Sequence, residues 1–227
     1  MLFRNPASIL ARRAAQVMMP IAFILSTGVD ARAGGLVDRL YVELQAGAGW
    51  LYGNDVVIDD EGTELESDVD FDLGVIGGGA VGIDINDNWR AELEYMYRSN
   101  DVDDFGGSQI DADSGDFASV AIMANAEYRF GAPEQALRPY VGAGIGIIEE
   151  IDFDVEGGDD AGEFSDRGDL AFQLMAGTDY ALSPSWSLAA ELRYFDAGSV
   201  KLDGDGDREL KADYRVTSLL LGVRYNF

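Results

Sequence analysis

The sequence predicts an all-β fold: an eight-stranded antiparallel transmembrane β-barrel with long external loops and short periplasmic turns. Three observations lead to this prediction. Apolar residues recur with a period of two in eight segments, long and short connections alternate between these segments, and the last segment ends on aromatic residues. Successive side chains of a strand point to opposite faces, so this alternation separates a bulky apolar face from a small or polar one. The 227 residues suffice for one large all-β domain or for two small ones.

The last segment, residues 214–227, shows the pattern most clearly. Its apolar face consists of Leu219, Leu221, Val223, Tyr225 and Phe227. Aromatic residues at the end of a strand are typical of a membrane–water interface, and we expect Tyr225 and Phe227 to form the barrel-closing terminal signal. An open sheet edge would leave backbone groups unpaired in hydrocarbon. The last strand should therefore pair with residues 40–51.

The other segments follow the same scheme. Alternation is found in residues 40–51, 70–85, 89–98, 117–130, 138–151, 169–182 and 186–195. Long polar stretches, expected to be loops, are residues 52–69, 99–116, 152–168 and 197–213. Within 70–85, we place Phe71 on one face with Leu73, Val75 and Val81. Each segment supplies at least the ~9–11 residues that a tilted strand needs to cross a bilayer.

The first 33 residues have the features of a secretory signal peptide. Early arginines precede a mostly apolar run over 14–25, and a small-x-small site ends at Ala33. This arrangement predicts cleavage after Ala33, with residues 34–227 forming the barrel domain.

Charge and composition exclude several classes of function. The chain has 16 basic and 42 acidic residues, no His and no Cys, and a net charge of −26. Nucleic-acid binding depends on Lys and Arg meeting phosphates, so we exclude a nucleic-acid partner. The commonest metal ligands and the commonest general base are also missing.

Three short stretches resemble a known family. They are RPYVGAGIG (138–146), SPSWSLAAELRYF (183–195) and LLGVRYNF (220–227). The sequence resembles the small outer-membrane β-barrels, which include opacity-type surface antigens and the barrel half of outer membrane protein A. The resemblance implies export to the outer membrane of a Gram-negative bacterium and contact with membrane lipid and lipopolysaccharide. It also implies insertion by the barrel-assembly machinery, and we expect a monomer.

One face of the strands collects charged residues that we predict to form an ionic network in the lumen. They are Glu43, Arg90, Glu92, Glu94, Glu127, Arg129, Asp179, Glu191, Arg193 and Arg224. An eight-stranded barrel is just wide enough for side chains to fill it, and buried charges must be paired. The network is interpreted as an ion-pair plug, and the alternative is a gated, narrow ion path. Glu92 and Glu94 are poor candidates for a catalytic pair because they share one strand with arginine neighbours.

The four long polar stretches hold 25 acidic residues against 4 basic ones. Within them, Asp203, Asp205 and Asp207 resemble the first half of a calcium-binding loop, although Arg208 replaces the expected glycine. We expect at most a weak Ca²⁺ or Mg²⁺ site there and no other cofactor. The alternative is a solvated, self-repelling surface.

Three functions from different classes fit these features. The first is a structural or surface-interaction barrel, and the second is a narrow, low-conductance porin-like channel for small ions. The third is a lipid-modifying enzyme, but the relatives with that activity use a catalytic His, which this chain lacks. We favour the first and expect no enzymatic activity.

Overall fold

The computed structural model describes residues 35–52, 54–60, 62–106, 114–158, 161–204, 206 and 208–227. The expected signal peptide, residues 1–33, lies outside the described residues. Within them, eleven strands form one antiparallel sheet, and a short 3₁₀ helix, η1 (Val37–Arg39), precedes the first strand. No helix in this part of the chain has the length and hydropathy that a membrane crossing would need.

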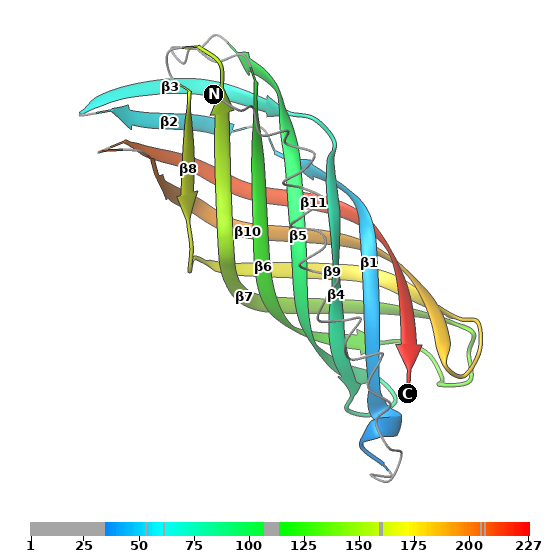
Figure 1. Ribbon diagram of the computed structural model, residues 1–227. Coiled ribbons are helices and arrows are strands. Elements are labelled where there is room, and N and C mark those ends of the chain that lie inside the picture. The colour runs from blue at the N-terminus through cyan, green and yellow to red at the C-terminus, as the bar shows by residue number, and fades with distance from the viewer. Residues whose placement is uncertain are drawn as a thin grey trace, which may run out of the picture.

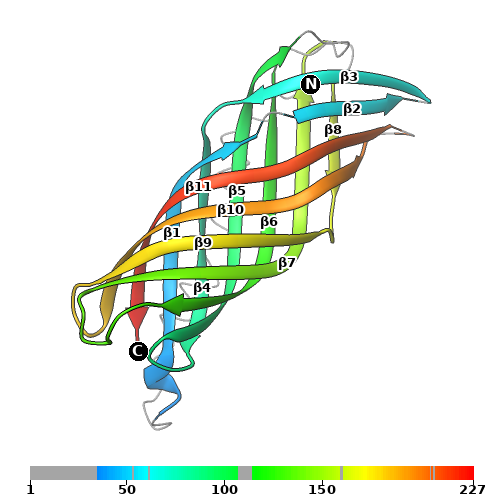
Figure 2. The same ribbon diagram turned by 180° about the vertical axis from the view of Figure 1, so that it is seen from behind.

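The strands wrap into an elongated barrel (Figures 1 and 2). Their bounds are β1 (Leu40–Leu51), β2 (Asn54–Asp60), β3 (Thr63–Phe71), β4 (Gly74–Asp84), β5 (Trp89–Gly106), β6 (Ser114–Arg129), β7 (Leu137–Glu156), β8 (Gly162–Asp166), β9 (Leu170–Ala181), β10 (Trp186–Asp203) and β11 (Glu209–Asn226).

Eight strands close the lower part of the barrel. The ring runs β1, β4, β5, β6, β7, β9, β10 and β11, and it closes where β1 pairs with β11 from Tyr41 opposite Asn226 to Leu51 opposite Val216. The Phe227 N–H donates to the Leu40 carbonyl at 3.2 Å, so the pairing continues to the last residue. The predicted eight-stranded barrel, with its last strand paired to the first, is confirmed.

The upper part of the barrel corrects the prediction of long loops. There β2 and β3 take the place of β1 and β4, because β2 pairs with β11 and β3 pairs with β5. In the same way β8 takes the place of β9, pairing with β7 and, through Asp203 opposite Ser165, with β10. Much of each long polar stretch therefore continues the barrel wall. We call this upper part, made of β2, β3, β8 and the distal ends of β5, β6, β7, β10 and β11, the collar.

The expected strand over 70–85 is divided by a break at Asp72 and Leu73. Phe71 belongs to β3 and packs against buried apolar residues, whereas Val75 belongs to β4 and is 57% exposed. Placing Phe71 on one face with Leu73, Val75 and Val81 was therefore wrong for Phe71. At this break the chain passes from the collar into the lower ring. The alternation of inward and outward residues does not continue across it, so counting by twos from β4 places Phe71 on the wrong face.

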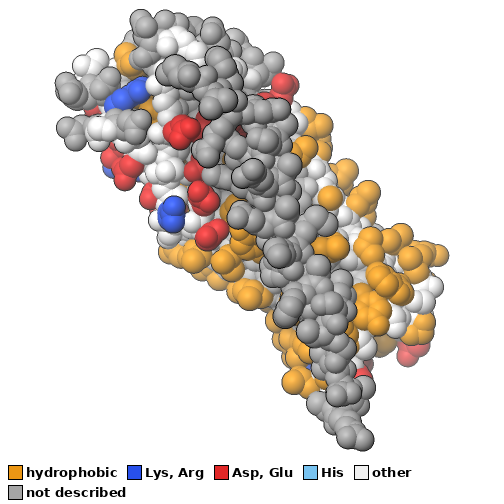
Figure 3. Space-filling model, in the orientation of Figure 1, with side chains coloured by type: hydrophobic (Ala, Val, Ile, Leu, Met, Phe, Trp, Pro, Cys, Tyr) orange, Lys and Arg blue, Asp and Glu red, His pale blue; other side chains and the backbone are white. Residues whose placement is uncertain are grey.

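The two faces of the wall exchange their chemistry between the lower part and the collar. Along β11, the residues from Leu210 to Arg224 are buried at every second position without interruption. The buried side chains are apolar up to Val216 and polar or small at several positions from Ser218 on. The outward side chains change from charged to apolar between Arg215 and Leu219. Figure 3 shows the result on one face: hydrophobic side chains cover the lower part and acidic ones gather above.

Candidate functional site in the barrel interior

Two groups of polar side chains lie inside the lower ring, and every member is at most 7% exposed. The turn-side cluster lies nearer the short turns and consists of Tyr41, Glu43, Arg90, Glu92, Glu127, Asp179 and Arg224. The mid-barrel cluster lies above it and consists of Gln45, Glu94, Asn125, Gln173, Glu191 and Arg193. Both clusters come from the inward positions of the alternating strands.

The strand register creates two ion pairs of the turn-side cluster. Glu43 on β1 lies directly opposite Arg224 on β11, and Arg90 on β5 lies directly opposite Glu127 on β6. Residues opposite each other on one face of an antiparallel pair have neighbouring Cβ atoms. The Arg224 Nε donates to Glu43 Oε2 at 2.7 Å, and the Arg90 guanidinium donates to Glu127 Oε2.

Asp179 joins these two pairs from β9. Its Oδ2 accepts from Arg90 Nη1 at 2.6 Å and from Arg224 Nη1 at 3.1 Å. The guanidinium carbons also lie near tyrosine rings: Arg224 is 4.6 Å from the Tyr41 centroid and Arg90 is 4.6 Å from the Tyr140 centroid. Such cation–π contacts are stronger where water is excluded. The two arginines are therefore held by carboxylates and aromatic faces together.

Arg193 organises the mid-barrel cluster. Its Nη1 lies 2.8 Å from Glu94 Oε2, its Nη2 lies 2.7 Å from Glu191 Oε1, and Nη2 also donates to Gln45 Oε1 at 3.1 Å. The Tyr140 hydroxyl donates to Glu191 Oε2 at 2.8 Å. Because the Tyr140 ring also lies beside Arg90, this tyrosine links the two clusters.

Inward glycines leave room for these large side chains. A Cβ at Gly222 would lie 2.4 Å from Glu43 Oε1, and a Cβ at Gly82 would lie 2.1 Å from Cζ of Tyr41. Both distances are far shorter than van der Waals contact. The glycines of β4 and β11 thus make it possible to fit an ionic network inside a narrow barrel.

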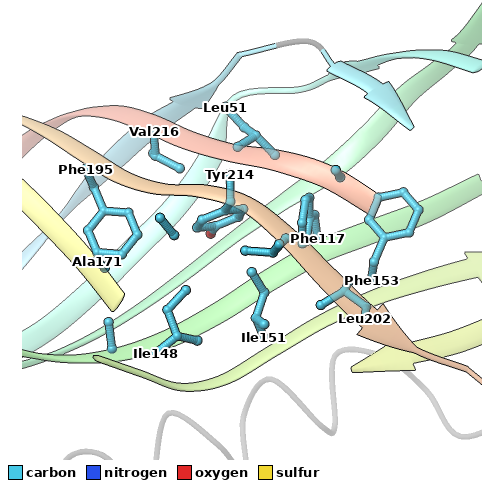
Figure 4. Close-up of a cluster of buried hydrophobic side chains, with 14 of the residues drawn as sticks. Leu51, Phe117, Ile148, Ile151, Phe153, Ala171, Phe195, Leu202, Tyr214 and Val216 are labelled. Carbon is cyan, nitrogen blue, oxygen red and sulfur yellow. The ribbon is translucent and has the colours of Figure 1, made fainter. Parts of the chain in front are cut away.

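Above the clusters, the interior is filled by a hydrophobic core that we call the apolar plug (Figure 4). Its members include Leu51, Phe117, Ile148, Ile151, Phe153, Ala171, Phe195, Leu202, Tyr214 and Val216, which are at most 5% exposed. The Phe117 ring lies 4.7 Å from that of Tyr214 and 5.0 Å from that of Phe153. The Ser119 hydroxyl donates to the Tyr214 hydroxyl at 2.9 Å, so the polar end of this tyrosine is satisfied.

Arg98 marks the boundary between the ionic and apolar parts. Its guanidinium carbon stacks 3.9 Å from the Phe195 centroid, and the residue is 0% exposed. Its Nη1 lies 3.5 Å from the Met96 carbonyl, a weak contact. Side chains therefore occupy the barrel interior from the turns, through two ionic clusters and Arg98, to the apolar plug in the collar.

The structure brings together nine of the ten residues that the sequence placed in the lumen network. Arg129 is set apart: it lies at the turn end of β6, where its Nη2 bonds Asp84 Oδ1 at 2.5 Å. Tyr225 and Phe227 lie together on the outside of the barrel, with ring centroids 5.3 Å apart, and Trp186 lies 5.0 Å from Tyr225.

The predicted cation site lies mostly outside the described residues, because Asp205 and Asp207 do. Asp203 ends β10 and lies opposite Glu209 and Ser165. Within the described residues, no group of three or more Asp or Glu side chains has an arrangement that could hold a metal ion. Cation binding by the acidic segments stays a prediction.

The apolar plug was missed in the sequence, although a signal was present. Residues 209–216 alternate acidic or basic with apolar side chains, and Ile151, Phe153 and Val155 alternate with acids in the same way. Such segments are typical of strands with one face in water. Their high acidic content led to the prediction of loops.

The sequence profile of the family described as outer membrane protein beta-barrel domain matches residues 19–227. No curated protein gave a significant match. Among solved structures, neisserial surface protein A is similar with a TM-score of 0.50 at 22% identity, covering 83% of this chain and 97% of that one. OprG from Pseudomonas aeruginosa is similar with a TM-score of 0.56 at 16% identity, with the same coverage of 83% and 97%.

At these identities, the solved structures show the fold alone. The family match covers far more than half of the chain and accords with a closed eight-stranded ring whose outer face is apolar. The chain therefore belongs to the family of outer membrane β-barrel proteins.

Proposed function

We propose that this protein is a structural and surface-interaction barrel of the Gram-negative outer membrane, with a closed interior and no enzymatic activity. The observation that carries the proposal is the filled interior, in which the turn-side and mid-barrel clusters lie beneath the apolar plug. An ion crossing the barrel would have to displace paired charges first and tightly packed aromatic side chains next. Each displacement opposes conduction.

The alternative, a narrow porin-like channel, is less well supported. The ionic clusters would suit an ion path, but the plug above them presents Phe117, Phe153 and Leu202 rather than polar groups. A conducting form would therefore need a rearranged collar.

The collar supplies the surface for interactions outside the cell. The outward positions of β3 carry Glu64, Glu66 and Asp68, while its inward positions are apolar or small. A row of acids also crosses four strands, since Asp203, Glu209, Asp59 and Glu64 lie successively opposite one another. Like charges placed directly opposite are destabilising in a sheet. Divalent cations that screen this row, and bridge it to lipopolysaccharide phosphates, are the partners that we propose for the collar.

Two bases of the collar, Lys201 and Lys211, lie beside this row. Lys211 Nζ is 3.1 Å and Lys201 Nζ is 3.5 Å from Glu209 Oε1. The hydrogen bond from Lys211 lowers the pKa of Glu209, with smaller effects from both lysine charges. Glu209 therefore stays ionised when the pH falls moderately below neutral.

Conductance across a planar lipid bilayer tests the closed interior. We expect the wild-type protein to give no current steps above the lipid baseline. The double variant Phe117→Ala, Phe153→Ala removes two rings from the plug and should give more frequent openings if it folds. Val141→Ala, on the outward face of β7, is the matched control and should behave as wild type. Sustained ohmic conductance of the wild type would support the channel instead.

A further inference from the structure

The charges of the two interior clusters do not balance. Six carboxyl groups, from Glu43, Glu92, Glu94, Glu127, Asp179 and Glu191, face three guanidinium groups, from Arg90, Arg193 and Arg224, and all nine residues are at most 7% exposed. Even if Arg98 is added, the carboxyl groups exceed the guanidinium groups by two. Uncompensated buried charge is strongly unfavourable, and a buried group often becomes neutral instead. The excess therefore requires bound positive charge.

Glu92 is the carboxyl group that the neighbouring arginines neutralise least. Its Oε1 lies 3.8 Å from both Arg90 Nε and Arg224 Nη2, beyond hydrogen-bond distance. Arg90 is already engaged by Glu127 and Asp179, and Arg224 by Glu43 and Asp179. The Tyr41 hydroxyl donates to Oε1 at 2.7 Å, but Oε2 is buried without a hydrogen-bond donor in the described structure.

A second carboxyl group, that of Glu127, lies on the neighbouring strand beside Glu92. Glu92 on β5 lies diagonally across from Glu127 on β6, because Glu92 is opposite Asn125 and Arg90 is opposite Glu127. Glu127 Oε2 accepts from Arg90 Nε, the same nitrogen that lies 3.8 Å from Glu92 Oε1, so the two carboxyl groups approach one guanidinium group from neighbouring strands. Two ionised carboxylates offer only acceptors, so a hydrogen bond between them requires a proton. Two carboxylates that share a site in this way cannot both ionise easily.

We propose that Glu92 and Glu127 form a proton-binding site that holds one proton between them at neutral pH. The charged and titratable groups around this pair are Tyr41 and Glu43 from β1, Arg90 from β5, Tyr140 from β7, Asp179 from β9, Glu191 from β10 and Arg224 from β11. The bound proton supplies the missing donor between the two acceptors. It also removes one negative charge from the turn-side cluster without a bulky counter-ion, which suits a lumen filled by side chains.

Infrared spectroscopy of the full chain in lipid vesicles tests this proposal. A protonated carboxyl group has a carbonyl band separate from the bands of carboxylates. At neutral pH the exposed acids are ionised, so the wild type should show a band from one buried carboxyl group that shifts in heavy water. The band should disappear in Glu92→Gln and in Glu127→Gln, since the amide then donates to the remaining carboxylate. It should persist in Glu163→Gln, an exposed residue of β8.

Absence of the band from the folded wild type at neutral pH would overturn the proposal, and this result needs no variant to fold. A band that persists in both glutamine variants would also overturn it, because another acid would hold the proton. If the band is absent and thermal stability depends on whether the salt is sodium or the larger tetramethylammonium, a small cation fills the site instead of a proton.

Discussion

The lower ring and the collar are built from the same continuous strands, yet their two faces have opposite chemistry. In the lower ring, Arg224 and Glu43 point inward and Leu221 points outward, whereas in the collar Tyr214 points inward and Lys211 points outward. The inward register of β11 does not change between them. Strand geometry therefore decides which positions alternate, and the surroundings decide which chemistry each face takes. A lipid-facing wall needs apolar residues outside, and a water-facing wall needs them inside.

The largest expected effect on the unfolding free energy comes from replacing an inward arginine of β11, in comparison with an outward arginine of the same strand. Arg224→Met leaves Glu43 without its guanidinium partner and removes one of two arginines from Asp179, so we expect a loss of about 3–5 kcal/mol in unfolding free energy. Arg215→Met is the control, because Arg215 is a half-exposed collar residue whose ion pairs contribute at most about 1 kcal/mol. Urea unfolding in detergent measures both. Equal losses of unfolding free energy in the two variants would mean that water reaches Arg224 inside the lower ring.

A cavity in the apolar plug should destabilise the collar and leave the lower ring unchanged. Phe153→Ala removes a fully buried ring, and such truncations cost about 3–5 kcal/mol. We expect faster hydrogen exchange of collar amides in β6, β7 and β8, with the lower ring unchanged. Leu192→Ala, on the lipid-facing side of β10, is the control. Faster exchange throughout the barrel would show that the collar and the lower ring unfold as one unit.

A positive charge placed on the outer face should lower the unfolding free energy in the lower ring but not in the collar, and by less than the changes above. Leu221→Arg puts a cation on the apolar belt of β11, which costs about 2–4 kcal/mol near the middle of a bilayer. Glu163→Arg puts the same residue on the outer face of the collar and should change the unfolding free energy little. If both variants insert and fold equally well in vesicles, Leu221 does not face lipid.

The smallest expected effect concerns cations at the collar. Close carboxylates in water repel by roughly 1 kcal/mol per pair, and salt weakens this over about 8–10 Å. We expect millimolar Ca²⁺ to slow proteolysis of the collar, and Asp59→Asn with Glu64→Gln to reduce that protection. Equal cleavage rates in Ca²⁺ and in monovalent salt of the same ionic strength would mean that the acidic row is only solvated.

The lower ring was predictable from the sequence because its pattern is local. Period-two alternation located β1 and, within a few residues, most of the other strands of that ring, and it placed Glu43, Arg193 and Arg224 on one face. The collar was not predicted, because acidic outward positions such as those of β3 have the composition of a loop. The collar also depends on pairings such as that of β2 with β11, which join segments far apart in the sequence and leave no local signal.

The details of the interior were beyond sequence reasoning for a related physical reason. Which charges meet across a lumen depends on the stagger of strands that are not neighbours, as in the contact of Asp179 with Arg90. The stacking of Arg98 on Phe195 depends on that stagger and on side-chain rotamers. Arg129 was grouped with the network by its strand face, but β6 ends there and places it beside Asp84.

The outer face of β11 should pass from water into lipid between Arg215 and Leu219, where its outward side chains change from charged to apolar. The chain contains no Cys, so single cysteines can be placed at outward positions 211, 213, 215, 217, 219, 221 and 223 and given a spin label in lipid vesicles. We predict that labels at 211 and 213 collide mainly with a water-soluble relaxation agent, and that labels at 219, 221 and 223 collide mainly with oxygen dissolved in lipid. Accessibility to the water-soluble agent at all seven positions would mean that this face of β11 lies in water along its whole length.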